Sequence, residues 1–295
     1  MARRLTVVAA ALGIWLGVLA GFLLVVSSML HGPDAGSLFG PRVAIVELEG
    51  LIVEVDDLVR ELKRHRENPL VRAVVIRINS PGGVVAPTQE LHGAIRRLRE
   101  AGKPVVASLG AIAASGGYYV AVAADQIYAN PGTLTGSIGV IMQLANVGGL
   151  MKKVGVDYVV VKSGQFKDIG NLSRPMTPDE RQVLQTLLDD VHGQFIEAVA
   201  DGRKLDRARV IQFADGRVFS GAQAKGLRMV DVLGGLEDAV NGAAKLAGLP
   251  TPPNVIAPRR RFSLVDLLRN QLGLGGEAVL RGGLPFLRTP LYLMD

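Results

Sequence analysis

A serine followed by two glycines separates two apolar runs in the segment Gly110-Ala-Ile-Ala-Ala-Ser115-Gly-Gly-Tyr-Tyr119. Residues 104–108 before it indicate a short buried strand, and residues 118–124 after it indicate the start of a helix. The glycines lack a Cβ, so the backbone can bend there and aim its amides at an oxyanion near a helix N-terminus. Ser115 is therefore a candidate nucleophile. The alternative is an ordinary serine cap on a tightly packed helix.

A serine hydroxyl is a weak nucleophile at neutral pH and needs a general base. The chain has four histidines, each in a helix or loop context that favours an ordinary structural role: His31, His65, His92 and His192. Lysine is the remaining candidate, because its amine accepts a proton once it is removed from water. Lys167 follows a strand-like run in a glycine-containing loop, where parallel sheets place their sites, and Lys162 is its local competitor. Spacing alone leaves this choice open.

Strand-like and helix-like segments alternate along residues 42–249, which predicts βαβ crossovers and a mostly parallel sheet. β-branched and apolar residues predict strands at 42–49, 71–78, 104–108, 126–129 and 157–161. Helical spacing of apolar residues and terminal signals predict helices at 56–66, 88–100, 177–203, 207–213 and 236–247. The helix after Thr177 has the clearest start signal, since Pro178 and two acidic residues follow the cap.

The N-terminal residues predict a membrane anchor. Residues 5–30 carry no charge, follow Arg3 and Arg4, and are long enough to span a hydrocarbon core of about 30 Å. This run is longer than the apolar part of a cleavable signal. We therefore expect a transmembrane segment within residues 1–30, with a cytosolic N-terminus because the basic residues precede it. Residues 31–41 then form a linker, 42–249 an extracytoplasmic domain, and 250–295 a proline-rich linker with an amphipathic tail.

Composition narrows the class of protein. A chain of 295 residues that is 48% hydrophobic can bury a substantial core, and the absence of cysteine excludes disulfides and thiol catalysis. Positive charge gathers at residues 3–4 and 259–261 instead of alternating with aromatics, which argues against nucleic-acid binding. The tail segment 262–272 suits a membrane surface, a groove on a partner subunit or a packed terminal helix.

Several motifs together resemble the signature of signal peptide peptidases of the SppA type, in their shorter single-domain form. They are Asn79-Ser-Pro-Gly-Gly83, Ala113-Ala-Ser115-Gly-Gly-Tyr-Tyr119, Thr135-Gly-Ser137-Ile-Gly-Val140 and Ser163-Gly-Gln-Phe-Lys167. The likeness extends over residues 42–248 and includes the segment 215–221. It implies a Clp- and crotonase-like fold, in which helices stack on a twisted parallel sheet, and no metal or cofactor. It also implies a homo-oligomer whose adjacent subunits share each site.

Position by position, the resemblance implies Ser115 as nucleophile, Lys167 as general base and Ser137 as the residue that orients the lysine. It implies an oxyanion hole made by the amides of Gly116 and of Gly82 or its neighbour Gly83, where two backbone donors stabilise the transition state. An apolar run directly follows the glycine loop, and we expect it to help line a narrow pocket for small or aliphatic side chains: Val84, Val85 and Ala86.

The function implied is that of a membrane-anchored serine endopeptidase that works through an acyl-enzyme. Its substrates would be remnant signal peptides and other unfolded apolar polypeptides, at the bacterial inner (cytoplasmic) membrane with the catalytic domain on the periplasmic or extracytoplasmic side. The first alternative is a catalytically silent, membrane-anchored oligomeric scaffold with the same fold. The second is a crotonase-like acyl-CoA enzyme, which has no evident use for Lys167 or an anchor.

Overall fold

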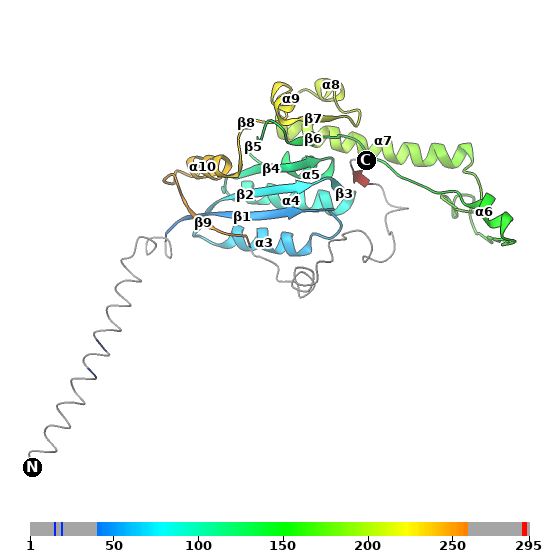
Figure 1. Cartoon of the computed structure of the whole chain (residues 1–295), viewed down its shortest axis with the longest axis horizontal. Coiled ribbons are helices and arrows are strands. Elements are labelled where there is room, and N and C mark those ends of the chain that lie inside the picture. Colours follow the sequence, from blue (N-terminus) through cyan, green and yellow to red (C-terminus); the bar gives the residue numbers. More distant parts are fainter. Residues whose placement is uncertain (1–14, 16–18, 20–39, 259–290, 294–295) are drawn as a thin grey trace, which may run out of the picture.

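Strand β4 (Val105–Ala114) lies near the middle of a mixed, mostly parallel sheet in the computed structural model, which describes residues 15, 19, 40–258 and 291–293 (Figure 1). On one edge, β4 pairs in parallel with β2 (Val71–Ser80), which pairs in turn with β1 (Arg42–Glu49). On the other edge, β4 pairs first with β5 (Gln126–Ala129) and then with β6 (Leu134–Gly136). This branching places the end of β6 beside the end of β4.

Shorter strands complete the described sheets. β8 (Val232–Leu233) pairs in parallel with β5, and β9 (Asn254–Ile256) pairs in parallel with β1. β7 (Val218–Ser220) runs antiparallel to β6. A separate two-stranded sheet joins β3 (Gly82–Val84) to β10 (Leu291–Leu293) in antiparallel register. The fold is thus α/β with a mostly parallel sheet, as the alternation of segments predicts.

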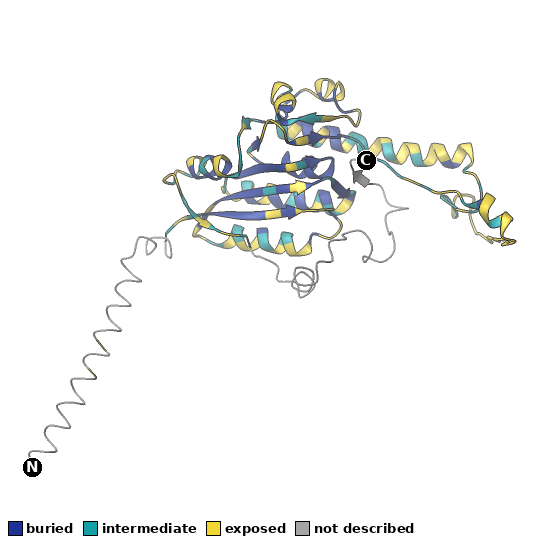
Figure 2. Ribbon diagram, in the orientation of Figure 1, coloured by how far each residue is buried: buried dark blue, intermediate teal, exposed yellow. Residues whose placement is uncertain are grey.

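Helices cover both faces of the sheet (Figures 1 and 2). Their bounds are α3 Asp56–Glu67, α4 Val85–Glu100, α5 Gly116–Ala121, α6 Gly148–Lys153, α7 Pro178–Arg203, α8 Arg207–Ile211, α9 Gly221–Gly226 and α10 Leu236–Leu246. Apolar residues of α3, α4, α5 and α7 join one core cluster, and α10 packs in another. The two clusters follow the two-residue period of the strands: Val43 and Ile45 of β1 face α10, while Ala44 and Val46 belong to the larger core.

Helix α7 begins where its start signal predicts. The Thr177 side chain accepts a hydrogen bond from the Glu180 amide at 3.2 Å, and the Glu180 carboxylate accepts one from the Thr177 amide at 2.9 Å. This reciprocal capping satisfies two amides that the first turn leaves without helical partners. The C-terminal part of α7 is buried through residues such as Phe195 and Val199, whereas Val183 and Leu187 near its start are exposed (Figure 2).

The segment between β6 and α7 forms an arm that carries α6 away from the sheet, beside the exposed end of α7 (Figure 1). The strand predicted at 157–161 is wrong: these residues form no strand. Their β-branched composition suits a strand, but no strand among the described residues pairs with them, and strand stability depends on pairing. Several large apolar side chains of the arm are exposed instead: Leu150, Val154, Val156, Tyr158, Val159 and Val161.

Other predicted boundaries shift. β4 continues to Ala114 instead of ending near residue 108, helix α5 begins at Gly116, and helix α4 begins at Val85 instead of near residue 88. The expected transmembrane segment within residues 1–30 lies, apart from Trp15 and Leu19, outside the described residues. In the part of the chain that the structure describes, no helix combines the length and apolarity needed to cross a membrane.

Candidate active site

Ser115 occupies a sharp turn between β4 and α5. Its φ of 51° and ψ of −118° are unfavourable for a residue with a Cβ, and its amide donates a 2.7 Å hydrogen bond to the carbonyl of Gly136 on β6. The residue is fully buried, yet its Oγ has no hydrogen-bond partner among the described residues. A strained turn that holds an unpartnered hydroxyl at the end of a parallel strand suits a nucleophile better than a helix cap.

Ser137 lies next to this turn because of strand register. Ala114 of β4 pairs with Gly136 of β6, so Ser115 and Ser137 are the next residues at the ends of adjacent parallel strands. Ser137 is also buried and has a φ of 50°. Its amide donates to the carbonyl of Arg217 at 2.9 Å, which ties this strand end to the turn before β7. The structure therefore brings together the two serines that the sequence motifs single out.

The predicted oxyanion glycines also meet here. A Cβ on Gly116 would lie 3.2 Å from the Cα of Gly82 and 3.2 Å from the amide nitrogen of Gly83. A glycine at position 116 lets the start of α5 approach that loop closely, because an added Cβ would make contacts tighter than usual. The Gly82 amide already donates to the Ser80 hydroxyl at 3.1 Å, and Gly82 has a φ of 112°. Of the two alternatives, Gly83 is the better placed partner for the first amide of α5.

The three residues predicted to line a pocket after the glycine loop take different environments. Val84 is half-buried at the end of β3, Val85 is buried as the first residue of α4, and Ala86 is exposed. Because a helix starts at Val85, the three side chains diverge. Of the three, Val84 alone belongs to β3, the strand that also contains Gly82 and Gly83.

Lys167 lies on the arm and is exposed. It contributes to a cavity of about 260 Å³ together with arm residues such as Met151, Tyr158 and Leu172. Its ammonium group has no ion pair with any described residue. Lys162, its competitor, is instead paired with Asp168 at 2.5 Å and donates to the Gln165 carbonyl. Geometry therefore favours Lys167 as the available amine, although the chain does not bring it to Ser115.

Ionic contacts hold the base of the arm. Arg174 donates to Glu180 of α7 at 2.5 and 2.8 Å and to Asp168 at 2.9 Å. The hydrogen bonds from Lys162 and then from Arg174 keep the pKa of Asp168 well below its usual range. Asp168 is therefore a carboxylate at neutral pH and keeps Lys162 engaged.

Comparison with known proteins decides the family. Residues 97–250 match the family model that is described as peptidase family S49. This chain belongs to peptidase family S49. Three relatives illustrate the likeness. This chain is 46% identical to a candidate protease of Synechocystis sp. over 209 residues. The alignment covers 70% of this chain and 75% of the relative. The chain is 35% identical over 219 residues to protease 4 of Salmonella typhi (71% and 35%). It is 34% identical over 189 residues to a candidate signal peptide peptidase SppA of Enterococcus faecium (64% and 55%).

The resemblance predicted from the motifs is thus confirmed, and the protein is a serine-type peptidase of family S49. None of the described histidines is a hydrogen-bond partner of the Ser115 hydroxyl. His65 lies 3.7 Å from Glu61 on α3, and His92 packs edge-on against Tyr119 with ring centroids 5.0 Å apart. His31 lies outside the described residues.

His92 predicts how the stability of this S49 peptidase depends on pH. Burial, and then the charges of Arg96 and Arg99, lower its pKa to about 4 from an ordinary 6.5. On acidification, His92 is therefore protonated near pH 6.5 in the unfolded chain but only near pH 4 in the folded chain. We expect this residue to lower the free energy of unfolding by roughly 2–3 kcal/mol on going from pH 7 to pH 4.

Unfolding midpoints of wild type and His92→Phe between pH 7 and pH 4.5 check this prediction. Phenylalanine keeps the ring contact with Tyr119 but does not titrate, so the variant should lose less stability on acidification. If the unfolding midpoints of the two proteins decrease equally with falling pH, His92 does not contribute to the pH dependence of stability.

Sequence reasoning missed the strand partner of the glycine loop. Leu291–Leu293 pair antiparallel with β3, so that Tyr292 lies opposite Gly83 (Figure 1). Ile52 pairs with the other edge of β3. Its amide donates to the carbonyl of Gly82 at 2.9 Å, and its carbonyl accepts from the amide of Val84 at 2.7 Å. Residues 259–290, which include the predicted amphipathic segment 262–272, lie outside the described residues. The available signal was composition, because Tyr292 is a residue type enriched in strands.

Proposed function

We propose that this S49 peptidase is a serine endopeptidase with a serine-lysine dyad, which cleaves remnant signal peptides and other apolar polypeptide segments. The observation that carries the proposal is the buried, unpartnered hydroxyl of Ser115 on a strained turn beside the glycine amides. In the proposed reaction, the Ser115 hydroxyl gives its proton to a neutral amine and attacks the peptide carbonyl. The amides of Gly83 and Gly116 stabilise the resulting oxyanion.

The tetrahedral intermediate then collapses to an acyl-enzyme. The C–N bond of the substrate breaks, and the leaving amine takes the proton that the base received from Ser115. A water molecule attacks the ester and gives a proton to the same base, which releases the new carboxylic acid and restores the serine hydroxyl. Every bond change is accounted for by one nucleophile, one base and one water molecule.

We propose that Lys167 of a neighbouring subunit is the base. Two observations support this assignment: the arm extends away from the sheet that carries Ser115 (Figure 1), and it exposes several large apolar side chains, in line with its mostly exposed colouring in Figure 2. Exposed apolar surface of this kind marks interaction sites. Docking of the arm onto a second copy would remove Lys167 from water, which is the condition under which a lysine amine accepts a proton. Ser137, beside Ser115, would then orient that amine.

The substrate backbone would bind along β3. A peptide that adds to the edge of a strand gains main-chain hydrogen bonds without regard to its sequence. The antiparallel pairing of Leu291–Leu293 with Gly82–Val84 supports this proposal, because it gives that edge an apolar strand of the kind that a substrate would supply. In this arrangement the tail competes with substrate, and Val84 contributes to an apolar pocket for the residue at the cleaved bond.

Membrane attachment is part of the proposal. The uncharged run at 5–30, preceded by Arg3 and Arg4, would hold the domain at the bacterial inner membrane with the peptidase on the periplasmic side. Location beside the bilayer suits apolar substrates that the membrane releases. Recovery of the whole chain in the soluble fraction after cell lysis, without detergent, would exclude the anchor.

Cleavage of a quenched fluorescent apolar peptide by the detergent-solubilised chain tests the proposed activity. We expect hydrolysis after alanine or leucine to exceed hydrolysis after lysine or glutamate, and a fluorophosphonate probe to add to Ser115 with one equivalent per chain.

A chain that ends at residue 289 should cleave with a lower KM, because the tail no longer occupies β3. An intact oligomer with neither cleavage nor labelling would instead identify a silent scaffold, and an unchanged KM would refute competition by the tail.

A further inference from the structure

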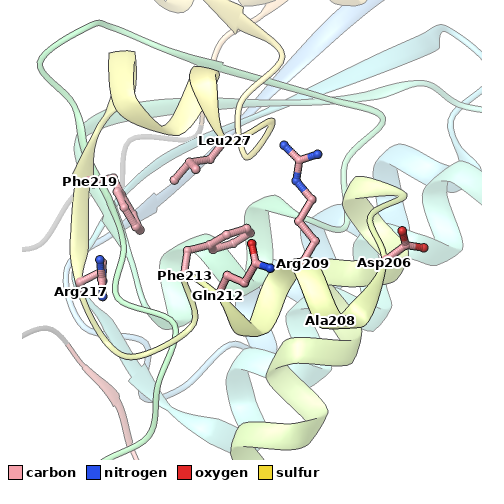
Figure 3. A pocket seen from close by; sticks show the side chains of 8 residues that line it. All are labelled: Asp206, Ala208, Arg209, Gln212, Phe213, Arg217, Phe219 and Leu227. Carbon is pink, nitrogen blue, oxygen red and sulfur yellow. The ribbon is translucent and has the colours of Figure 1, made fainter.

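A cavity of about 510 Å³ lies beside β7 and contains none of the residues that we assign to catalysis (Figure 3). Helix α8 and the residues that follow it form one side, and β7 and the end of α9 form the other. The lining residues are Asp206, Ala208, Arg209, Gln212, Phe213, Arg217, Phe219 and Leu227. A volume of this size is typical of sites that hold a small ligand.

The cavity has an apolar part. Phe213 is buried and meets Phe219 edge to face, with ring centroids 6.4 Å apart, and Leu227 lies across from the two rings in Figure 3. These side chains come from three separate segments of the chain and converge on one space. They would exclude water from an aliphatic or aromatic group placed between them, which favours binding of such a group.

One cation at the cavity is available to a ligand. Arg217 is held by both oxygens of Asp215, so its charge is already balanced. The guanidinium of Arg209, by contrast, forms no ion pair or hydrogen bond with the residues that the structure describes, and Figure 3 shows it reaching toward Leu227. Asp206 lies on the far side of Arg209 from the phenyl rings (Figure 3). A guanidinium beside an apolar wall matches a carboxylate on an apolar body.

The wall of the cavity is bonded directly to the catalytic strands. The carbonyl of Arg217 accepts the Ser137 amide at 2.9 Å, and Thr135 pairs with Phe219 in the β6–β7 register. A Cβ on Gly136 would lie 2.7 Å from the Phe219 ring, and the Gly136 carbonyl accepts the Ser115 amide. A ligand that moves Phe219 or Arg217 would therefore shift Gly136 and Ser137, which lie at the end of β6 next to the Ser115 turn.

We propose that this cavity binds an apolar carboxylate, and that its occupancy alters the reactivity of Ser115 through β7 and β6. Two sources supply that chemistry: a peptide with a free C-terminal carboxylate on an apolar residue, and a fatty acid. Arg209 would bind the carboxylate, and Phe213, Phe219 and Leu227 would enclose the apolar group. The site is separate from the proposed substrate strand on β3.

Titration calorimetry of the detergent-solubilised full chain tests the binding. The probes are acetyl-leucyl-phenylalanine and decanoate, each compared with its neutral amide. We expect at least one acid to bind with a stoichiometry of one per chain, and its amide to bind about tenfold more weakly or worse. The Arg209→Gln variant should lose a similar factor for the acid, and Arg209→Lys should recover part of it.

Arg207→Gln is the matched control, because Arg207 lies on the same short helix, does not line the cavity, and forms an exposed pair with Glu197. It should bind the acids as wild type does. Which acid binds identifies the source of the ligand. Equal affinity for acids and amides, affinity unchanged by Arg209→Gln, or no binding of either acid would each overturn the site.

The rate at which a fluorophosphonate labels Ser115 tests the coupling separately. Saturation with the bound acid should change this rate about fivefold or more in wild type and leave it unchanged in Arg209→Gln. A rate unaffected at saturation would refute the coupling. Binding of the acids does not require a reactive serine, so the calorimetric result stands or falls independently of the proposed peptidase activity.

Discussion

Mixing Ser115→Ala subunits with Lys167→Ala subunits should restore peptidase activity that neither variant has alone. Each variant on its own should lose activity by about a thousandfold or more, because one lacks the nucleophile and the other lacks the base. In a mixed oligomer, some sites combine the intact serine of one subunit with the intact lysine of its neighbour. With random mixing of equal amounts, about a quarter of the sites are intact in a closed symmetric ring.

The measurement is cleavage of the quenched apolar peptide after the variants are co-expressed, or dissociated and reassembled together. The control mixes Ser115→Ala subunits with subunits that carry both substitutions, a combination that contains no intact serine and should stay inactive. Lys162→Ala should retain most of the activity, because Lys162 pairs with Asp168 instead of acting as the base. Inactive Ser115→Ala and Lys167→Ala mixtures in an oligomer of normal size would contradict the shared site.

Substitution of Gly116 by alanine should lower kcat by about tenfold to a hundredfold while the protein stays folded. The new Cβ would lie 3.0 Å from the Thr88 hydroxyl and 3.2 Å from the backbone of both Gly82 and Gly83. These contacts are tight enough to push the glycine loop away by a few tenths of an ångström. The two proposed oxyanion donors are therefore displaced relative to each other, and transition-state stabilisation falls.

Steady-state kinetics with the apolar peptide, together with the thermal unfolding midpoint, check this prediction. Gly132→Ala is the matched control, because no heavy atom lies within 4 Å of its added Cβ, and it should keep the wild-type kcat. The predicted signature is a lower kcat with a similar unfolding midpoint. An unchanged kcat in Gly116→Ala would show that this amide does not face the oxyanion.

Much of the local chemistry followed from the sequence alone. The apolar run, Ser115 and the two glycines predict a strand, a sharp turn and a helix, since glycines without a Cβ permit the bend and the close packing at the start of that helix. The structure places β4, the strained Ser115 and α5 in that order. The start of α7 was likewise predictable, because Thr177, Pro178 and Glu180 act within one turn of helix. The motif order was enough to predict the family.

Relations between distant segments were decided only by the tertiary structure. Ser137 lies beside Ser115 because β4 divides its edge between β5 and β6, a register that local propensity does not encode. Residues 157–161 have strand-like composition, but none of the strands that the structure describes pairs with them, and they form part of an exposed arm. The tail strand Leu291–Leu293 lies on β3, far away in sequence. Side-chain type and turn geometry are local, so the candidate catalytic residues could be proposed from the order of amino acids. The tertiary structure decided which of them meet, because strand pairing and packing join segments that are remote along the chain.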